Sequence, residues 1–215
     1  MKRIVLSTTA IILFVLVSQT YVWAAIAVGV KKGDWIEYQV TVTGNPPAEH
    51  NAKWARMEVT KVENSSIDLN ITTQFTNGTY LYENVTLNLQ TGHLGDDFFI
   101  PANLSTGDQF FDAYNGNTTI NDTLTRTYAN TEREVLTATT RYTTYYWDQQ
   151  TGTLLEADST YPDQNYTITT IADKTNLWPP KMSPLETATV YGISGAIVIT
   201  VLAIMLLSCS KKKRT

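Results

Sequence analysis

Apolar and polar residues alternate along much of the chain between residues 32 and 173, and no long apolar pattern at helical spacing interrupts them. In residues 36–42 the apolar side chains occupy the even positions, and in residues 67–75 the apolar ones occupy odd positions. Because successive side chains of a β-strand point to opposite faces, this alternation is typical of strands that bury one face. The sequence therefore predicts a mainly β domain.

Turn signals divide this region into short strands. Asn77-Gly78 is the strongest, because a two-residue hairpin turn favours residues that tolerate positive φ. Series of about nine or ten short strands indicate an antiparallel meander that forms a curved sheet, a half-barrel or a sandwich. The less regular residues 100–117 are predicted to be a long loop or lid. Later strands are predicted at residues 118–128, 132–140, 141–148, 153–160 and 165–173.

The N-terminus has the parts of a secretory signal peptide. Two basic residues begin it, residues 4–17 are apolar, and Ala24 fits the cleavage position. We predict that residues 1–24 are removed. A cut after Ala27 and an uncleaved anchor are the alternatives, and each of them leaves the body of the chain outside the cytoplasm.

A second apolar segment lies near the C-terminus. Residues 187–208 carry no charge, and 22 helical residues extend roughly 33 Å, enough to cross a bilayer. The basic residues that follow place the tail, residues 209–215, in the cytoplasm. The sequence thus predicts an extracytoplasmic β domain over residues 25–173, a proline-containing stalk over residues 174–186, and one C-terminal transmembrane helix. The mature N-terminus is expected outside the cell membrane.

Composition excludes several classes of function. The only cysteine, Cys209, is in the predicted tail, so the β domain has neither disulfides nor a cysteine-based zinc site. The formal net charge of −4 conceals ten Lys or Arg against twenty Asp or Glu outside, a net of −10, which argues against nucleic-acid binding. His50 and His93 are the only imidazoles, and neither belongs to a recognisable catalytic motif. We predict no catalytic residues, metal or cofactor.

Eight acceptor sites for N-glycosylation lie in the predicted exterior, among fourteen asparagines there. Asn70 alternates with Leu69 and Ile71, so it should face water where a glycan has room. We predict glycosylation; accidental sequons in a Thr-rich chain are the alternative. The eight sites are Asn64, Asn70, Asn77, Asn84, Asn103, Asn117, Asn121 and Asn165.

Two further sets of residues each have two interpretations. A small-residue face on the predicted membrane helix fits either a homodimer contact or the ordinary composition of such helices. Five aromatic residues form either a platform for a sugar or lipid, or part of the core with cross-strand packing. The small-residue face consists of Ala188, Gly192, Ala196 and Thr200, and the platform of Trp35, Tyr142, Tyr145, Tyr146 and Trp147.

Four acidic residues lie close together in the irregular region. Asp96, Asp97, Asp108 and Asp112 could converge on calcium, which prefers several oxygen ligands. They do not follow the spacing of an EF-hand, and solvated loop carboxylates are the alternative.

Three segments carry a resemblance to known proteins. Residues 33–38 (Gly-Asp-Trp-Ile-Glu-Tyr), residues 99–104 with Gly107-Asp108, and residues 146–156 resemble segments of uncharacterised archaeal single-pass surface proteins. The last segment also looks like the strand–turn–strand of LolA/LppX-like lipoprotein carriers. That resemblance implies a curved sheet that holds acyl chains. A sequon-rich exterior without cysteine also fits an archaeal envelope.

The sequence favours a non-enzymatic, membrane-anchored cell-surface glycoprotein that serves in envelope interaction or assembly. One alternative is a carrier or sensor of a lipid or other apolar ligand within the curved sheet. A surface glycoside hydrolase with paired carboxylates is the weaker alternative. The partners expected are the membrane and other envelope proteins, glycans or lipids.

Overall fold

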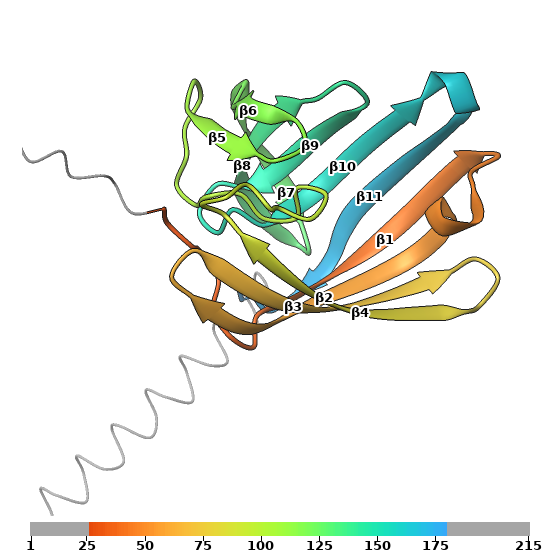
Figure 1. Ribbon diagram of the computed structural model, residues 1–215, viewed down its shortest axis with the longest axis horizontal. Helices are drawn as coiled ribbons and strands as arrows, with labels where there is room; N and C mark the ends of the chain where they lie inside the picture. Colours follow the sequence, from red (N-terminus) through yellow and green to blue (C-terminus); the bar gives the residue numbers. More distant parts are fainter. Residues whose placement is uncertain (1–25, 180–215) are drawn as a thin grey trace, which may run out of the picture.

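The computed structural model describes residues 26–179, which form a single antiparallel β domain with two short 3₁₀ turns (Figure 1). The predicted signal peptide (1–24), transmembrane helix (187–208) and basic tail (209–215), and most of the stalk, lie outside the described residues. Between residues 26 and 179, no helix has both the length and the apolar character needed to cross a bilayer.

Nine of the eleven strands form one sheet, and the remaining two form a separate hairpin. The nine are β1 (Trp35–Gly44), β2 (Ala52–Glu63), β3 (Ser66–Phe75), β4 (Tyr80–Asn88), β7 (Asp122–Tyr128), β8 (Thr131–Thr139), β9 (Thr143–Asp148), β10 (Leu154–Tyr161) and β11 (Tyr166–Thr175). The hairpin is β5 (Gln109–Asp112) and β6 (Gly116–Thr119), and the 3₁₀ turns are η1 (Ala48–His50) and η2 (Pro162–Gln164).

The large sheet consists of two meanders joined through the first and last strands. Its order is β4-β3-β2-β1-β11-β10-β9-β8-β7, with antiparallel pairing throughout. β1 pairs with β11 from Ile36 opposite Thr175 to Gly44 opposite Tyr166. The sheet curves so strongly that β7 returns to contact β11 (Figure 1). The predicted antiparallel meander with a curved sheet is therefore confirmed.

This order explains the predicted lid. β4 and β7 are at opposite edges of the sheet, so residues 89–121 must cross between the edges. The crossing carries the β5–β6 hairpin and fills the concave face, where Phe110 meets the Trp147 ring edge-on with 5.6 Å between centroids. The crossing also adds a short strand interaction, since the Ile100 N–H donates to the Gly152 carbonyl at 2.9 Å. Two segments of the family resemblance, residues 99–104 and 146–156, thus lie side by side.

The hydrophobic core lies between the concave face and this crossing segment. Alternate positions of β1, β2 and β3 point into it, as the alternation of the sequence predicted, whereas β8 is buried on both faces from Val135 to Ala138. Its largest fully buried side chains are Trp147, Tyr38, Ile36, Met57, Ile67, Leu69, Leu87, Leu94, Ile100, Ile120, Leu136 and Leu155.

Around the crossing segment, the strand assignment differs from the prediction in two places. The predicted strand at residues 118–128 is divided between β6 and β7, because buried Ile120 turns the chain inward and Asn121 N–H then donates to the Thr137 carbonyl. The lid contains β5, which the irregular composition of residues 100–117 did not indicate.

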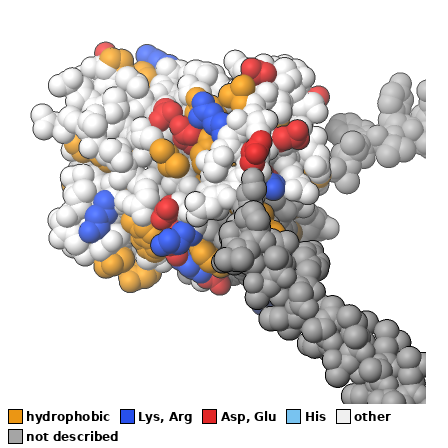
Figure 2. All heavy atoms as spheres, turned by 180° about the vertical axis from the view of Figure 1, so that it is seen from behind, with side chains coloured by type: hydrophobic (Ala, Val, Ile, Leu, Met, Phe, Trp, Pro, Cys, Tyr) orange, Lys and Arg blue, Asp and Glu red, His pale blue; other side chains and the backbone are white. Residues whose placement is uncertain are grey.

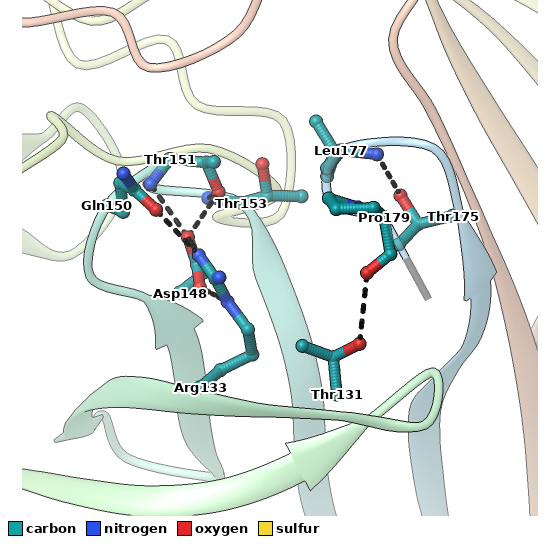
Figure 3. Close-up of polar contacts among 9 residues, drawn as sticks. All are labelled: Thr131, Arg133, Asp148, Gln150, Thr151, Thr153, Thr175, Leu177 and Pro179. Carbon is teal, nitrogen blue, oxygen red and sulfur yellow. Dashed lines mark hydrogen bonds and ion pairs between the residues drawn. The ribbon is translucent and has the colours of Figure 1, made fainter. Parts of the chain in front are cut away.

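A buried ion pair fixes the place where the chain leaves the domain (Figure 3). Asp148 is fully buried and accepts hydrogen bonds from Arg133 at 2.6 and 3.1 Å and from the N–H and hydroxyl of Thr151 at 2.8 Å each. The Arg133 guanidinium also lies 4.6 Å from the ring centre of buried Trp178. At the same end, Ala27 accepts a hydrogen bond from Ala102. Residues 27 and 179 therefore leave the domain at one end.

Gly152 is a turn glycine that another residue should replace only at a large cost in stability. It has φ +71°, and a Cβ there would lie 2.1 Å from the Ile100 carbonyl oxygen. Gly107 is a matched control, with φ +90° and no atom within 4 Å of its Cβ position. We expect Gly152→Ala to lower the free energy of unfolding by roughly 3–5 kcal/mol and Gly107→Ala by roughly 1–2 kcal/mol. Urea unfolding measures both, and equal losses would contradict this packing.

Candidate functional site

The outer face of β1–β4 carries a row of aromatic and amide side chains. Gln39 lies opposite Trp54, Trp54 opposite Gln74, and Gln74 opposite Tyr80. Residues directly opposite each other on antiparallel strands share a face, so these four side chains form one line across the sheet. The core-facing residues of the same strands, such as Tyr38 and Met57, alternate with them.

This row lines a groove of about 570 Å³, together with Val40, Lys53 and Thr72. Tyr80 is 51% exposed and Trp54 is half-buried, so the aromatic rings border the groove while remaining accessible. Figure 2, seen from behind, shows hydrophobic side chains gathered low on the face in view, beside Lys or Arg side chains. Lys53 is the only charged residue that lines the groove.

A second row of side chains runs beside the groove on the same face, and its charged members pair with each other rather than pointing into the groove. Arg56 donates to Glu37 at 2.8 Å and lies 4.2 Å from the ring centre of Trp35. Thr72 and Tyr82 continue this row across β3 and β4. The rings of Tyr82 and Tyr80 are stacked, with 6.2 Å between centroids.

The groove is suited to a neutral, polar ligand with an apolar face. Indole and phenol rings bind C–H surfaces through dispersion and their π faces. The amide of Gln74 can donate and accept hydrogen bonds, and the amide of Gln39, which donates one hydrogen bond to Asp173 at 3.3 Å, retains a second N–H and its carbonyl oxygen. A sugar ring offers C–H groups on its face and hydroxyls on its rim, which is the combination this row complements.

The structure distributes the five residues of the predicted aromatic platform over separate places. Trp35 lies on the outer face under Arg56. Tyr145 and Trp147 stack in the interior with 5.1 Å between centroids, and Trp147 is fully buried. Tyr146 points to the other face of β9, under Arg126 from β7.

The remaining member, Tyr142, belongs to an aromatic cluster at the end of the domain away from residues 27 and 179. Its ring stacks on Tyr161 at 5.7 Å, and Tyr161 stacks on Tyr166 at 4.6 Å. The Nδ1 atom of His50 is 2.7 Å from the Tyr166 hydroxyl. A pocket of about 160 Å³ lies between Tyr142 and the η2 turn. His93, the other imidazole, lies 3.2 Å from the Thr91 hydroxyl and is exposed.

All eight predicted glycosylation acceptors have exposed side chains. Asn70 and Asn84 lie directly opposite each other on the outer face of β3 and β4. Asn77 is in the β3–β4 turn, where its Oδ1 atom accepts hydrogen bonds from the N–H and hydroxyl of Thr79. The sites therefore meet the spatial requirement for carrying glycans. The predicted membrane packing face, by contrast, lies outside the described residues.

The four acids considered for calcium separate into two groups. Asp108 accepts a hydrogen bond from the Ser105 N–H in its own loop. Asp97 and Asp112 are both buried, and Asp97 lies near Asp96 and Asp112. Within residues 26–179, no three His, Cys, Asp or Glu side chains converge in a metal-binding arrangement. Burial, reinforced by the charges of Asp112 and Asp96, raises the pKa of Asp97 to about 7.

Sequence reasoning missed the residues that line the groove, although a signal for them exists. Trp54, Arg56 and Glu58 alternate with three apolar residues along β2. Because Arg56 and Glu58 are charged, their face of the strand is expected to face solvent, and Trp54 is on the same face. Tryptophan is enriched at binding surfaces. The sequence pattern did not predict a strand at β2, because charged residues are frequent along it.

Comparison with known proteins gives no family. No protein-family model matches the sequence, and no curated protein does. A candidate lipoprotein of Parabacteroides distasonis is 10% identical with a TM-score of 0.43, over 71% of this chain and 98% of its own. The siderocalin Ex-FABP is 9% identical (TM-score 0.26; 77% and 85% covered), and the lipocalin Q83 is 11% identical (TM-score 0.28; 77% and 80% covered). Likenesses this weak carry no inference about ligand or activity.

The buried Asp97 predicts a pH-dependent stability. Its folded-state pKa is raised from 3.8 to about 7, so its stabilising contribution is complete below about pH 4 and is lost as the pH rises through 7. Asp97→Asn keeps a residue that tolerates the positive φ of 59° and removes the charge. We expect this variant to have a higher melting temperature than the wild type at pH 8. Its melting temperature should also change less between pH 4 and 7 than that of the wild type.

Thermal unfolding monitored by circular dichroism at several pH values tests this. Asp163→Asn, at an exposed acid in η2, serves as the control and should retain the wild-type pH dependence. A lower melting temperature of Asp97→Asn at pH 8 would refute the role assigned to Asp97.

Proposed function

We propose that this protein is a non-enzymatic, single-pass cell-surface glycoprotein whose β domain binds carbohydrate in the outer-face groove. The observation that carries the proposal is the row of Gln39, Trp54, Gln74 and Tyr80, which places aromatic rings between amides in a groove of about 570 Å³. Pockets for small ligands commonly combine aromatic walls with a few well-placed polar groups. None of the residues lining this groove is an acid, so the groove offers no carboxylate pair for a glycoside hydrolase.

The position of the chain ends supports an orientation at the membrane. Residue 179 leaves the domain beside the Arg133–Asp148 pair, eight residues before the predicted transmembrane segment at residue 187. That end would face the membrane. The aromatic cluster around Tyr161 would then face away from it, and the groove would open sideways along the cell surface.

The glycosylation sites support an exterior location. Eight exposed acceptors and the absence of cysteine from residues 26–179 fit an exported domain that is protected by glycans rather than by disulfides. The same combination supports an archaeal envelope as its setting.

A second candidate function, binding of an apolar ligand, is favoured by the part of the concave face that the crossing segment leaves open. Val42 and Ile168 share that face with the buried Tyr38, yet each is only half-buried. A lipid or other apolar molecule could cover them.

Truncating the groove tryptophan should strongly weaken carbohydrate binding. We expect at least one of soluble β-glucan, mannan and galactan to retard the full chain in affinity electrophoresis, and Trp54→Ala to weaken that retardation at least tenfold. The loss follows from removal of the stacking surface. Tyr114→Ala, at a lid residue that is 84% exposed and does not line the groove, should behave like the wild type.

The same assay separates the two candidate functions. Ile168→Lys places a charge on the concave face and should leave carbohydrate retardation unchanged. Equal retardation of wild type and Trp54→Ala, or none with any polysaccharide, would contradict the proposal. A lipid that co-purifies with the wild type and is absent from Ile168→Lys would favour the second function instead.

The mass of the native protein tests glycosylation directly. Protein purified from its own membranes should exceed the mass of the bare polypeptide by several glycans, and Asn84→Gln should remove the mass of one of them. Asn115→Gln, at an exposed asparagine outside any sequon, is the control and should change nothing. A native mass equal to that of the polypeptide would show that the sequons are unused.

A further inference from the structure

The edge strand β4 has an unusual surface. It is the first strand of the sheet and pairs with β3, and in the described domain its other edge is bridged only at its last residue, where Asn88 pairs with His93. Three consecutive residues on it have exposed apolar side chains, with Tyr80 at 51%, Leu81 at 41% and Tyr82 at 71% exposure. Tyr80 and Tyr82 are on the outer face, and Leu81 is on the concave face opposite Thr73.

Exposed edges of this kind are normally protected. Proteins shorten edge strands, charge them or cover them, because their unpaired N–H and C=O groups accept another strand. The opposite edge strand, β7, is shielded by its return to β11. β4 spans nine residues, and its exposed apolar trio is at the end away from residues 27 and 179.

We propose that the first residues of β4, Tyr80 to Tyr82, pair antiparallel with the same residues of a second copy and so join the two sheets about a two-fold axis at Leu81. This inference does not depend on whether the groove binds carbohydrate. Opposed residues of antiparallel strands lie on the same face, and the two faces alternate along each strand. A two-fold axis perpendicular to the sheet therefore keeps each face continuous only when even-numbered residues pair with even-numbered ones and odd with odd. Centring on Leu81 then places Leu81 opposite its counterpart and Tyr80 opposite Tyr82 of the second copy, so all three apolar residues meet apolar partners.

The glycosylation sites favour the same register. It places Asn84 opposite Gly78 of the second copy, where no heavy atom lies within 4 Å of the Cβ position. A register centred on Tyr82 would instead place Asn84, and any glycan on it, against Tyr80. A second copy in this register therefore brings the exposed apolar trio onto its own counterpart and keeps Asn84 away from Tyr80.

The size of the contact sets the conditions for a test. With roughly 200 Å² for each aromatic side chain, the trio exposes on the order of 300 Å² per copy. Two copies bury about 600 Å², which is below the ~1,200–2,000 Å² of stable soluble complexes. The pairing should be weak in dilute solution and effective where a shared membrane confines both copies.

Cysteine crosslinking in membranes tests the contact. In the full chain with Cys209→Ser, Leu81→Cys places two thiols across the axis, where opposed residues are about 4.5–5.5 Å apart between Cα atoms, within disulfide range. Glu83→Cys is the matched control on the same face. Its two thiols would be about 14 Å apart along the strands, because each residue advances the strand by about 3.4 Å.

Mild oxidation followed by a non-reducing gel gives the result. We expect at least tenfold more dimer from Leu81→Cys than from Glu83→Cys, with circular dichroism confirming that both variants fold. Equal crosslinking at the two positions, as a dimer held only by the membrane segments would produce, overturns the proposal. Absence of crosslinking at residue 81 overturns it as well, and an edge strand that takes a different protein would produce that outcome.

Discussion

The pairing of β1 with β11 is the interaction on which the remaining structure depends. It joins two meanders that each add strands outward, so the free edges are β4 and β7. The chain between these edges has to cross the concave face, and that crossing supplies the lid that fills the interior. The same pairing brings residues 27 and 179 to one end, where buried Asp148 and Arg133 fix the departing segment against Trp178. One long-range strand pair therefore determines the interior, the edges and the direction of the anchor.

Much of this architecture follows from the sequence. Alternation in residues 36–42 and 67–75 and the Asn77-Gly78 turn predicted strands and their inward faces, because a single period of two specifies both. The partner of β1 could not be predicted, since that pairing joins residues more than 120 positions apart and leaves no local signal. The division of residues 118–128 into two strands was also hidden, because Ile120 looks like any strand residue until its tertiary contacts are known.

The candidate site could be predicted less well than the fold. The predicted aromatic platform came from the densest run of aromatic residues, and it included Tyr145 and Trp147, which stack inside the domain. The groove instead depends on side chains from four strands that are aligned only by register, with Trp54 and Tyr80 as its aromatic members. Local sequence shows which face a side chain occupies but not which side chains lie opposite it. Binding sites on the faces of sheets are for that reason harder to predict than turns or glycosylation sites.

The central claim is that the outer face of β1–β4 binds carbohydrate. Nuclear magnetic resonance of the isotope-labelled chain, titrated with gluco-, manno- and galacto-oligosaccharides, tests it most directly. The account predicts that the side-chain amides of Gln39 and Gln74 and the indole N–H of Trp54 shift, while the buried indole of Trp147 does not. Shifts confined to Ile168 and its neighbours on the concave face, or no shifts with any of the three, would contradict it.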